Sequence, residues 1–307
     1  IQELKDRIAS VIVGQEQTVD LVLTAILANG HVLIEGVPGV AKTLLARLTA
    51  RLIDADFSRI QFTPDLMPSD VLGTTVFNMK TNGFDFHQGP IFADIVLVDE
   101  INRAPAKTQA ALFEVMEERQ ISIDGTTHRM GDLYTILATQ NPVEQEGTYK
   151  LPEAQLDRFL MKITMDYPSL EEEVNILERH HTNAALVKLD DITPAITKEE
   201  VLSLRAFMNQ VFVDRTLLQY IALIVQQTRT SKAVYLGASP RASVAMLQSS
   251  KAYALLQGRD FVTPEDIKFV APYVLQHRLI LTAEAEMEGY SPVKVTQRLI
   301  DKVEVPK

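Results

Sequence analysis

The residues best suited to chemistry lie in the segment His31–Thr43, which reads HVLIEGVPGVAKT. An apolar strand, Val32–Glu35, leads into a glycine-rich loop, and Lys42 and Thr43 begin an apolar helix behind it. Glycines let backbone N–H groups turn inward around a polyphosphate, and a helix N-terminus adds its dipole and free donors. Lys42 can reach the β- and γ-phosphates, and the Thr43 hydroxyl can ligate Mg²⁺. The segment therefore predicts a phosphate-binding loop rather than a simple turn.

One position of this loop departs from the motif G-x-x-x-x-G-K-[ST], because Ala41 stands where the second glycine is expected. Alanine fits there if its φ is negative, as expected at the start of a helix, and Gly39 stays available for the sharp turn. The predicted nucleotide contacts from this loop are Gly36, Val37, Pro38, Gly39, Val40, Ala41, Lys42, Thr43 and Leu44.

A pair of carboxylates follows a second apolar strand, Ile95–Asp99. Continuous apolar residues are typical of a parallel strand that is buried on both faces, and ligands bind at the carboxyl ends of such strands. Asp99 would hold Mg²⁺, directly or through water, and Glu100 would polarise the water that attacks the γ-phosphate. Acidic residues often end strands, so the pair alone is weak evidence for a metal site. The separate phosphate-binding loop that precedes it in the sequence strengthens this interpretation.

Three further polar residues could complete this chemistry. Asn141 follows a strand and could contact the attacking water or the γ-phosphate, although it could equally be a turn residue before proline. Arg158 precedes the last strand of the core and could act across a subunit boundary, the alternative being a surface ion pair with Asp157 or Glu153. Arg241 lies in the first turn of a helix, where a cation is unfavourable for the helix dipole, so a phosphate partner would explain it.

The elements that position these residues fall into two regions. Residues 1–167 alternate apolar strands with helical stretches, which predicts an α/β core with a parallel sheet between helices. After Pro168 the strand signal ends, and residues 168–307 predict an all-α C-terminal lid domain. The predicted strands are Val32–Glu35, Arg59–Phe62, Ile95–Asp99, Thr135–Thr139 and Phe159–Thr164. The predicted helices of the lid are Leu170–His180, Lys198–Asn209, Arg215–Thr230, Pro240–Gln257 and Pro264–Leu275.

Two β-hairpins are predicted as insertions in the core. Each consists of two short runs around a turn-forming sequence. The first pairs Thr75–Met79 with Phe84–Gln88 around Thr81-Asn82-Gly83, and the second pairs Ile121–Ile123 with His128–Met130 around Asp124-Gly125.

Composition excludes several classes of function. The chain of 307 residues has no cysteine, which rules out disulfides, thiolate metal sites and a cysteine nucleophile. Its net charge of −10 argues against a broad nucleic-acid footprint, which needs clustered Lys and Arg. The adjacent His180 and His181 fit surface positions better than a metal site. With no signal peptide and no long apolar run, we expect a cytoplasmic protein.

The segments GVPGVAKT, DEINRAP, ATQNP, QLDRF and GASPRA, in this order, closely resemble the MoxR family of AAA+ ATPases, including the alanine at Ala41. The resemblance covers nearly the whole chain. It implies a hexameric ring with Mg²⁺ and ATP or ADP bound between subunits. It also implies that Val13 and Gly14 lie near the adenine, and that Glu100, Asn141, Arg158 and Arg241 serve hydrolysis.

The resemblance further implies a protein partner, because MoxR relatives are associated with the maturation or metal loading of other proteins. Their partners often carry a von Willebrand factor A domain. Arg103 is either a second sensor or trans-acting residue, or the partner of a local ion pair. The alternatives are a helicase-like nucleic-acid motor, a nucleotide-gated scaffold with little turnover, and a P-loop kinase. The two hairpins have few basic residues, which disfavours the nucleic-acid motor.

Overall fold

A computed structural model describes residues 2–142, 148–149, 151–182 and 189–306 of the chain. The chain folds into two compact units, each built from more than one stretch of sequence. The first comprises residues 1–19, 33–151 and 164–201, and the second comprises residues 20–32, 152–163 and 202–307. The division of the sequence after residue 167 into core and lid stays a prediction.

The central element is a five-stranded sheet, and it contains the five strands predicted from the sequence. Their order across the sheet is β2 (Phe57–Gln61), β5 (Ile95–Asp99), β8 (Thr135–Gln140), β1 (Val32–Gly36) and β9 (Met161–Met165). The pairs β2–β5 and β5–β8 are parallel, with Val98 opposite Ala138. The carboxyl ends of β5 and β8 therefore lie side by side, which is where the candidate acidic residues and Asn141 are found.

The sequence explains why these strands occupy the centre. All five residues of β5 are buried, as expected for an apolar strand that is covered on both faces. The helices that alternate with the strands are α1 (Gln2–Val11), α2 (Glu16–Leu27), α3 (Lys42–Leu52), α4 (Pro68–Leu72), α5 (Ala106–Glu118) and α7 (Leu170–His181). In α3 the buried Leu45, Leu48 and Leu52 recur every three to four residues, which is the spacing of one helix face. The predicted α/β core is confirmed.

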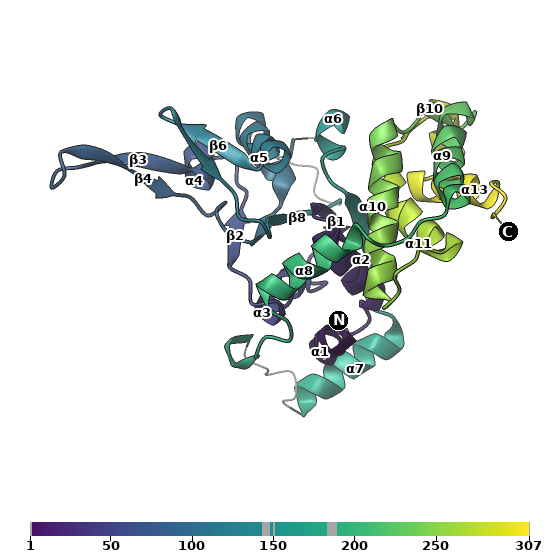
Figure 1. Cartoon of the computed structure of the whole chain (residues 1–307), viewed down its shortest axis with the longest axis horizontal. Helices are drawn as coiled ribbons and strands as arrows, with labels where there is room; N and C mark the ends of the chain where they lie inside the picture. Colours follow the sequence, from purple (N-terminus) through teal and green to yellow (C-terminus); the bar gives the residue numbers. More distant parts are fainter. Residues whose placement is uncertain (1, 143–147, 150, 183–188, 307) are drawn as a thin grey trace. The chain divides into compact units, whose positions relative to one another are not determined.

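Both predicted hairpins are confirmed as separate two-stranded ribbons. The strands β3 (Gly73–Asn78) and β4 (Gly83–Gln88) pair along their whole length and form an arm that extends away from the sheet (Figure 1). The strands β6 (Gln120–Ile123) and β7 (Thr126–Arg129) form the second ribbon. Asp124 and Gly125 both have positive φ, at 51° and 80°, which is the geometry of a tight two-residue hairpin turn.

The second unit is mainly helical and also contains a short β-ribbon that the sequence analysis missed. Its helices are α6 (Glu153–Leu156), most of α8 (Lys198–Met208), α9 (Arg215–Thr230), α10 (Pro240–Leu256), α11 (Pro264–Leu275), α12 (Ala283–Met287) and α13 (Pro292–Asp301). Two strands, β10 (Val234–Leu236) and β11 (Ile280–Leu281), pair in antiparallel fashion. The expectation that strands end after Pro168 is wrong at this point, because strands of two or three residues are too short to show a period of two.

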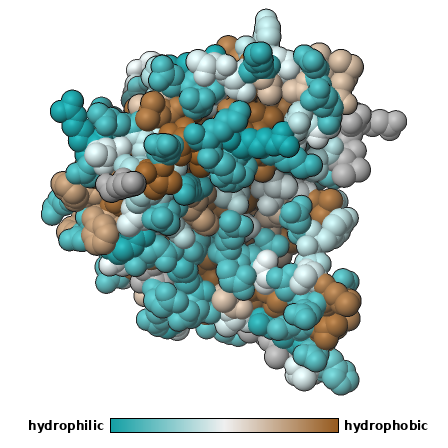
Figure 2. Space-filling view, turned by 90° about the vertical axis from the view of Figure 1, so that its right-hand side faces the viewer, coloured by the Kyte–Doolittle hydropathy of each residue, from teal (hydrophilic) through white to brown (hydrophobic). Residues whose placement is uncertain are grey.

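Hydrophobic residues are also exposed on this unit. Figure 2, viewed from the side of the C-terminal helices, shows brown hydrophobic residues between teal hydrophilic ones. Exposed large side chains of the second unit include Phe212, Tyr235, Val244 and Met287. Within the described part of the chain, no helix combines the length and apolar character that a membrane span requires.

Candidate nucleotide-binding site

The predicted phosphate-binding loop connects β1 to α3, and its backbone conformation differs from the expectation at Ala41. Ala41 lies in the left-handed region, with φ 61° and ψ 22°, so the prediction of a negative φ is wrong. Gly39 also has a positive φ of 89°, whereas Val40 between them does not. Alternation of this kind turns successive N–H groups toward one point and forms an anion-binding nest. An alanine in this conformation costs about 1–2 kcal/mol, and the need to converge the N–H groups explains why the chain accepts that cost.

The N-terminus of α3 is available to an anion. Ala41 occupies the N-cap position, and no side chain caps the helix. The N–H groups of the first turn of a helix have no partner within it, so they can bind phosphate oxygens. A Cβ placed on Gly39 would have no atom of the described residues within 4 Å, which shows that the loop is open on this side.

Lys42 folds back over its own loop. Its Nζ donates hydrogen bonds to Gly36 O at 2.5 Å and to Val37 O at 3.3 Å. Burial lowers the pKa of Lys42, and the charges of Asp99 and Glu100 act in the opposite direction. The ammonium therefore lies between the loop and the acidic pair, where it can exchange carbonyl oxygens for phosphate oxygens. Pro38 is exposed in the same loop.

Asp99 is buried at the end of β5 and is held by two neighbouring strands. Arg59 Nε on β2 donates to Asp99 Oδ2 at 2.7 Å, and Thr139 Oγ1 on β8 donates to Asp99 Oδ1 at 3.0 Å. Each carboxylate oxygen offers about two acceptor positions, so both oxygens keep capacity for a further ligand. Arg59 and Thr139 were not singled out in the sequence, because a polar residue within a strand carries no signal of its partner on a neighbouring strand.

Glu100 has an unusual backbone conformation next to Asp99. Its φ of 56° and ψ of 51° are left-handed, and its N–H donates to Thr139 Oγ1 at 3.0 Å. Glu100 Oε2 accepts a hydrogen bond from Gln61 Nε2 at 2.8 Å and lies 3.0 Å from Arg103 Nε. Strained residues of this kind concentrate at functional sites. For Arg103, the structure shows the local ion pair that the sequence left as one of two alternatives.

Asn141 is buried directly after β8, at the same end of the sheet as Asp99. Thr43 occupies the first turn of α3, next to Lys42.

Arg158 and Arg241 belong to the second unit, so their predicted roles in hydrolysis stay predictions. Within the described part of the chain, no group of three or more His, Asp or Glu side chains could hold a metal ion.

A cavity of about 280 Å³ adjoins the loop within the first unit. It brings the predicted Val13, Gly39, Val40, Ala41 and Leu44 together. Its remaining lining residues are Val11, Ile12, Gln15, Pro168, Ile176, Arg179 and His180. A largely apolar wall with a few polar groups suits a planar base.

The wall contributed by α7 was not predicted. His180 was expected to be a surface residue, and it is exposed yet lines this cavity. Gly14 lies close by with a φ of 72°, and a Cβ there would fall 2.3 Å from the Glu172 carboxylate. Glu172 is fixed by a capping box with Ser169, a pattern the sequence does show. What the sequence does not show is that α7 folds back against the segment Val11–Gln15.

Comparison with known proteins gives consistent results. The model of the ATPase family associated with various cellular activities (AAA) matches residues 31–161, and the model of the AAA lid domain matches residues 226–301. The chain is 48% identical over 301 residues to the uncharacterized protein YeaC of Bacillus subtilis, covering 98% of this chain and 93% of that protein. It is 44% identical over 306 residues to the chaperone MoxR1 of Mycobacterium tuberculosis, covering 97% of this chain and 80% of that protein. The crystal structure of a candidate ATPase from Cytophaga hutchinsonii superposes with a TM-score of 0.91 at 42% identity, covering 100% of this chain and 95% of that one.

Proposed function

The chain belongs to the MoxR family of AAA+ ATPases, and from this premise we propose that it hydrolyses ATP to remodel or mature a protein partner. The observation that carries the proposal is the left-handed conformation of Gly39 and Ala41 at the uncapped N-terminus of α3. It presents backbone donors to the phosphates of ATP, with Lys42 beside them. The neighbouring cavity, bordered by Val13, is the place for the adenine.

The acidic residues at the end of β5 would carry out the chemistry. Thr43 and Asp99 would hold Mg²⁺, and the free acceptor positions of the buried Asp99 carboxylate fit this ion. The bound ion would neutralise charge on the phosphates. Glu100 would orient and deprotonate the attacking water, which requires its carboxylate to leave Gln61 and Arg103. Asn141, buried after β8, would contact the same water or the γ-phosphate.

Of the two remaining arginines, one would act on a neighbouring chain and one on its own. We propose that the protein works in the cytoplasm as a homo-oligomeric ring, a hexamer, in which Arg158 of one subunit acts on the nucleotide of the next. Arg241 would contact the nucleotide of its own subunit. Arginine suits both places because its guanidinium is permanently charged and binds phosphate in bidentate fashion.

The arm formed by β3 and β4 is the proposed contact with a protein partner. Near its tip, Phe84 is 74% exposed and Met79 is 88% exposed, and Val76 and Phe77 are exposed as well. Phe77 and Phe84 stack edge to face, with ring centroids 5.2 Å apart, so they form one apolar patch. Exposed apolar patches of this kind mark interaction sites. A client protein, with or without a von Willebrand factor A domain partner, would bind here, and its maturation or metal loading would be the outcome.

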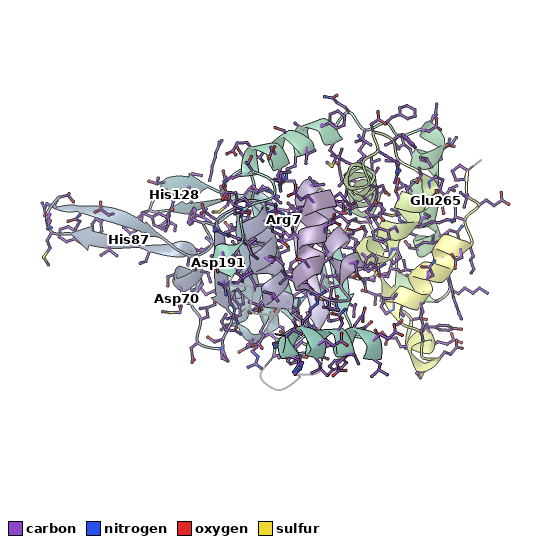
Figure 3. All side chains as sticks on the ribbon, turned by 90° about the horizontal axis from the view of Figure 1, so that it is seen from below. Arg7, Asp70, His87, His128, Asp191 and Glu265 are labelled. Carbon is purple, nitrogen blue, oxygen red and sulfur yellow. The ribbon has the colours of Figure 1, made fainter. Side chains whose placement is uncertain are left out.

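Phe86 on the same arm has a different role. Its ring lies 4.3 Å from the His128 ring on β7, and Thr75 Oγ1 donates to Asp124 Oδ2 at 2.6 Å. His87 on the arm and His128 on the second hairpin are labelled in Figure 3. Phe86 therefore joins the two hairpins to each other, and Phe84 is left for a partner.

Replacement of Lys42 tests the proposed nucleotide site. Lys42→Ala should abolish measurable ATP binding in titration calorimetry, because charge-assisted phosphate contacts contribute about 1.5–3 kcal/mol each. Lys107→Ala, an exposed change in the first turn of α5, serves as the control and should bind like the wild type. Unchanged affinity in Lys42→Ala would refute the assignment.

A further inference from the structure

Three consecutive residues after α11 donate side-chain hydrogen bonds to one short stretch of backbone, residues 157–162. Gln276 Nε2 donates to Lys162 O at 2.5 Å, and His277 Nε2 lies 3.0 Å from Phe159 O. Arg278 donates to the carbonyl oxygens of Asp157, Phe159 and Leu160. All of these residues belong to the second unit. The stretch contains Arg158, so the end of α11 fixes the backbone on both sides of that arginine.

Arg278 is the centre of this arrangement. Its side chain is only 5% exposed, and Nε donates to Asp157 Oδ1 at 2.6 Å. Nη2 donates to Asp157 O at 3.2 Å and to Phe159 O at 2.8 Å. Nη1 donates to Leu160 O at 3.1 Å and to Val274 O. A guanidinium has five N–H donors in a fixed plane, and these five contacts match them. The backbone at 157–160 therefore cannot shift without leaving a buried donor unpaired.

Stability alone is a poor explanation for this arrangement. A buried ion pair costs much of its Coulombic gain in desolvation, and apolar residues of similar size often stabilise a fold as well. What the planar guanidinium adds is geometry, because it defines the positions of three carbonyl groups at once. The side chain of Arg158 is half-buried, and its Nη1 donates to Ala154 O at 3.3 Å. This bond links the Arg158 side chain to α6, and Arg278 holds the backbone on both sides of it.

We propose that Arg278 is a positioning residue for Arg158, so that hydrolysis at a neighbouring subunit depends on the geometry of the helical unit. The inference rests on the proposed function of Arg158 as a residue that acts in trans. A cavity of about 370 Å³ supports it, because Asp157 and Arg278 border this cavity together with Ser239, the N-cap residue of α10. Arg241 lies in the first turn of that helix. The two arginines predicted to serve hydrolysis thus lie on segments that border one cavity together with Arg278.

The test uses the full chain with Arg278→Lys, which keeps the positive charge but loses the planar fork. We expect kcat for ATP hydrolysis to fall by about 10- to 100-fold, since a misplacement of about 1 Å can cost 100-fold. The dissociation constant of ATP should stay within about twofold of the wild-type value, because Arg278 is not proposed to contact the bound nucleotide.

Arg259→Lys is the matched control. Arg259 also forms a partly buried pair with a carboxylate in the second unit, donating to Asp266 at 2.5 and 2.8 Å. Among the described residues its hydrogen bonds go to Phe261 and Asp266, and none goes to residues 157–162. It should lower stability without lowering kcat. Amide hydrogen exchange should become faster at residues 158–162 in Arg278→Lys and remain unchanged there in Arg259→Lys.

Mixing subunits of two variants distinguishes a misplaced Arg158 from a general loss of folded protein. Lys42→Ala subunits cannot bind nucleotide but carry a correctly placed Arg158, so adding them to Arg278→Lys subunits should restore part of the activity. Arg158→Ala subunits should restore none. Failure of the Lys42→Ala subunits to restore activity, or loss of ATP affinity in Arg278→Lys, would overturn the proposal.

The trans role of Arg158 and the positioning role of Arg278 can be refuted independently of each other. Full activity of Arg158→Ala would refute the trans role of Arg158 itself. Loss of activity in Arg158→Ala together with full activity in Arg278→Lys would refute only the role of Arg278. If Arg278→Lys does not fold, Asp157→Ala carries the same expectations, because it removes the acceptor of Nε, and the guanidinium plane then loses one of the contacts that align it on the carbonyl groups.

Discussion

The hydroxyl of Thr139 donates a hydrogen bond of 3.0 Å to Asp99 Oδ1, from the end of β8 to the end of β5. The same oxygen accepts the N–H of Glu100 at 3.0 Å. One hydroxyl thus fixes the carboxylate proposed to hold Mg²⁺ and the backbone of the residue proposed to activate water. Because Glu100 has a left-handed backbone, the contact also supports a conformation that would otherwise be unfavourable.

Thr139→Val should therefore reduce both stability and turnover. Valine matches threonine in shape but leaves Asp99 Oδ1 and the Glu100 N–H with one partner fewer, at a cost of about 1–3 kcal/mol in the free energy of unfolding. The kcat for ATP hydrolysis should fall by about tenfold or more, because the acidic pair loses its alignment.

Thr135→Val is the matched control for this change. Thr135 is fully buried at the other end of β8, and its hydroxyl has no hydrogen-bond partner within the described structure. Its replacement should leave kcat unchanged and stability equal or slightly higher. Denaturant unfolding and a phosphate-release assay measure both quantities. Equal effects of the two substitutions would contradict the role given to Thr139.

Ala41→Gly should be tolerated, and for a different reason than the sequence suggested. Glycine adopts the left-handed conformation without the steric cost of about 1–2 kcal/mol that alanine bears, although it loses about 0.5–1 kcal/mol through the greater entropy of the unfolded chain. We expect an unchanged or slightly higher free energy of unfolding and an unchanged ATP dissociation constant. Ala41→Val should lower both stability and affinity, because a β-branched residue is strained at positive φ. Equal ATP affinity of the two variants would argue against the left-handed loop.

The sequence predicted the elements of the fold better than their contacts. The strand Ile95–Asp99 was predicted with its observed bounds, because an apolar run that ends in two carboxylates is distinctive. The negative φ predicted for Ala41 is wrong, because φ at a helix start depends on the loop that precedes it. Arg59 and Arg278 were missed for a common reason. Their partners, Asp99 and Asp157, lie 40 and 121 residues away in the sequence. The periodicity of hydrophobic residues indicates local helices and strands, and it does not indicate which distant residues form pairs.

His277 should make stability depend on pH. Burial lowers the pKa of His277 well below its ordinary value of 6.5, with the charge of Arg278 acting in the same direction. The unfolded chain then binds a proton that the folded chain does not, so this group stabilises the fold above pH 6.5 and that stability is lost as the pH falls. The loss approaches about 1.4 kcal/mol per pH unit for one group.

His277→Gln should reduce that dependence, since glutamine can still donate to Phe159 O but does not titrate. The measurement is urea unfolding of both proteins at pH 7.5 and pH 5.5. The wild type should lose more stability between these values than the variant does. Parallel losses in the two proteins would show that His277 is not the group responsible.

Nucleic acid should neither bind tightly to the protein nor stimulate its ATPase at physiological salt. The net charge is −10, and the arm Gly73–Gln88 contains one lysine, Lys80. A DNA-binding arm would need clustered cations. Replacement of residues 77–86 by a short Gly-Ser turn should leave the basal ATPase rate intact and remove the response to a protein partner. Oligonucleotide binding with a steep salt dependence, lost in this variant, would favour a nucleic-acid motor instead.

Glu100→Gln tests whether this site binds ATP and whether Glu100 promotes its hydrolysis. The measurement is ATP affinity and steady-state turnover of this variant beside the wild type under conditions where both assemble. We expect an ATP dissociation constant close to that of the wild type and a kcat lower by about 100-fold or more, the scale of a lost general base. Turnover near the wild-type rate would show that Glu100 is not the general base of this site.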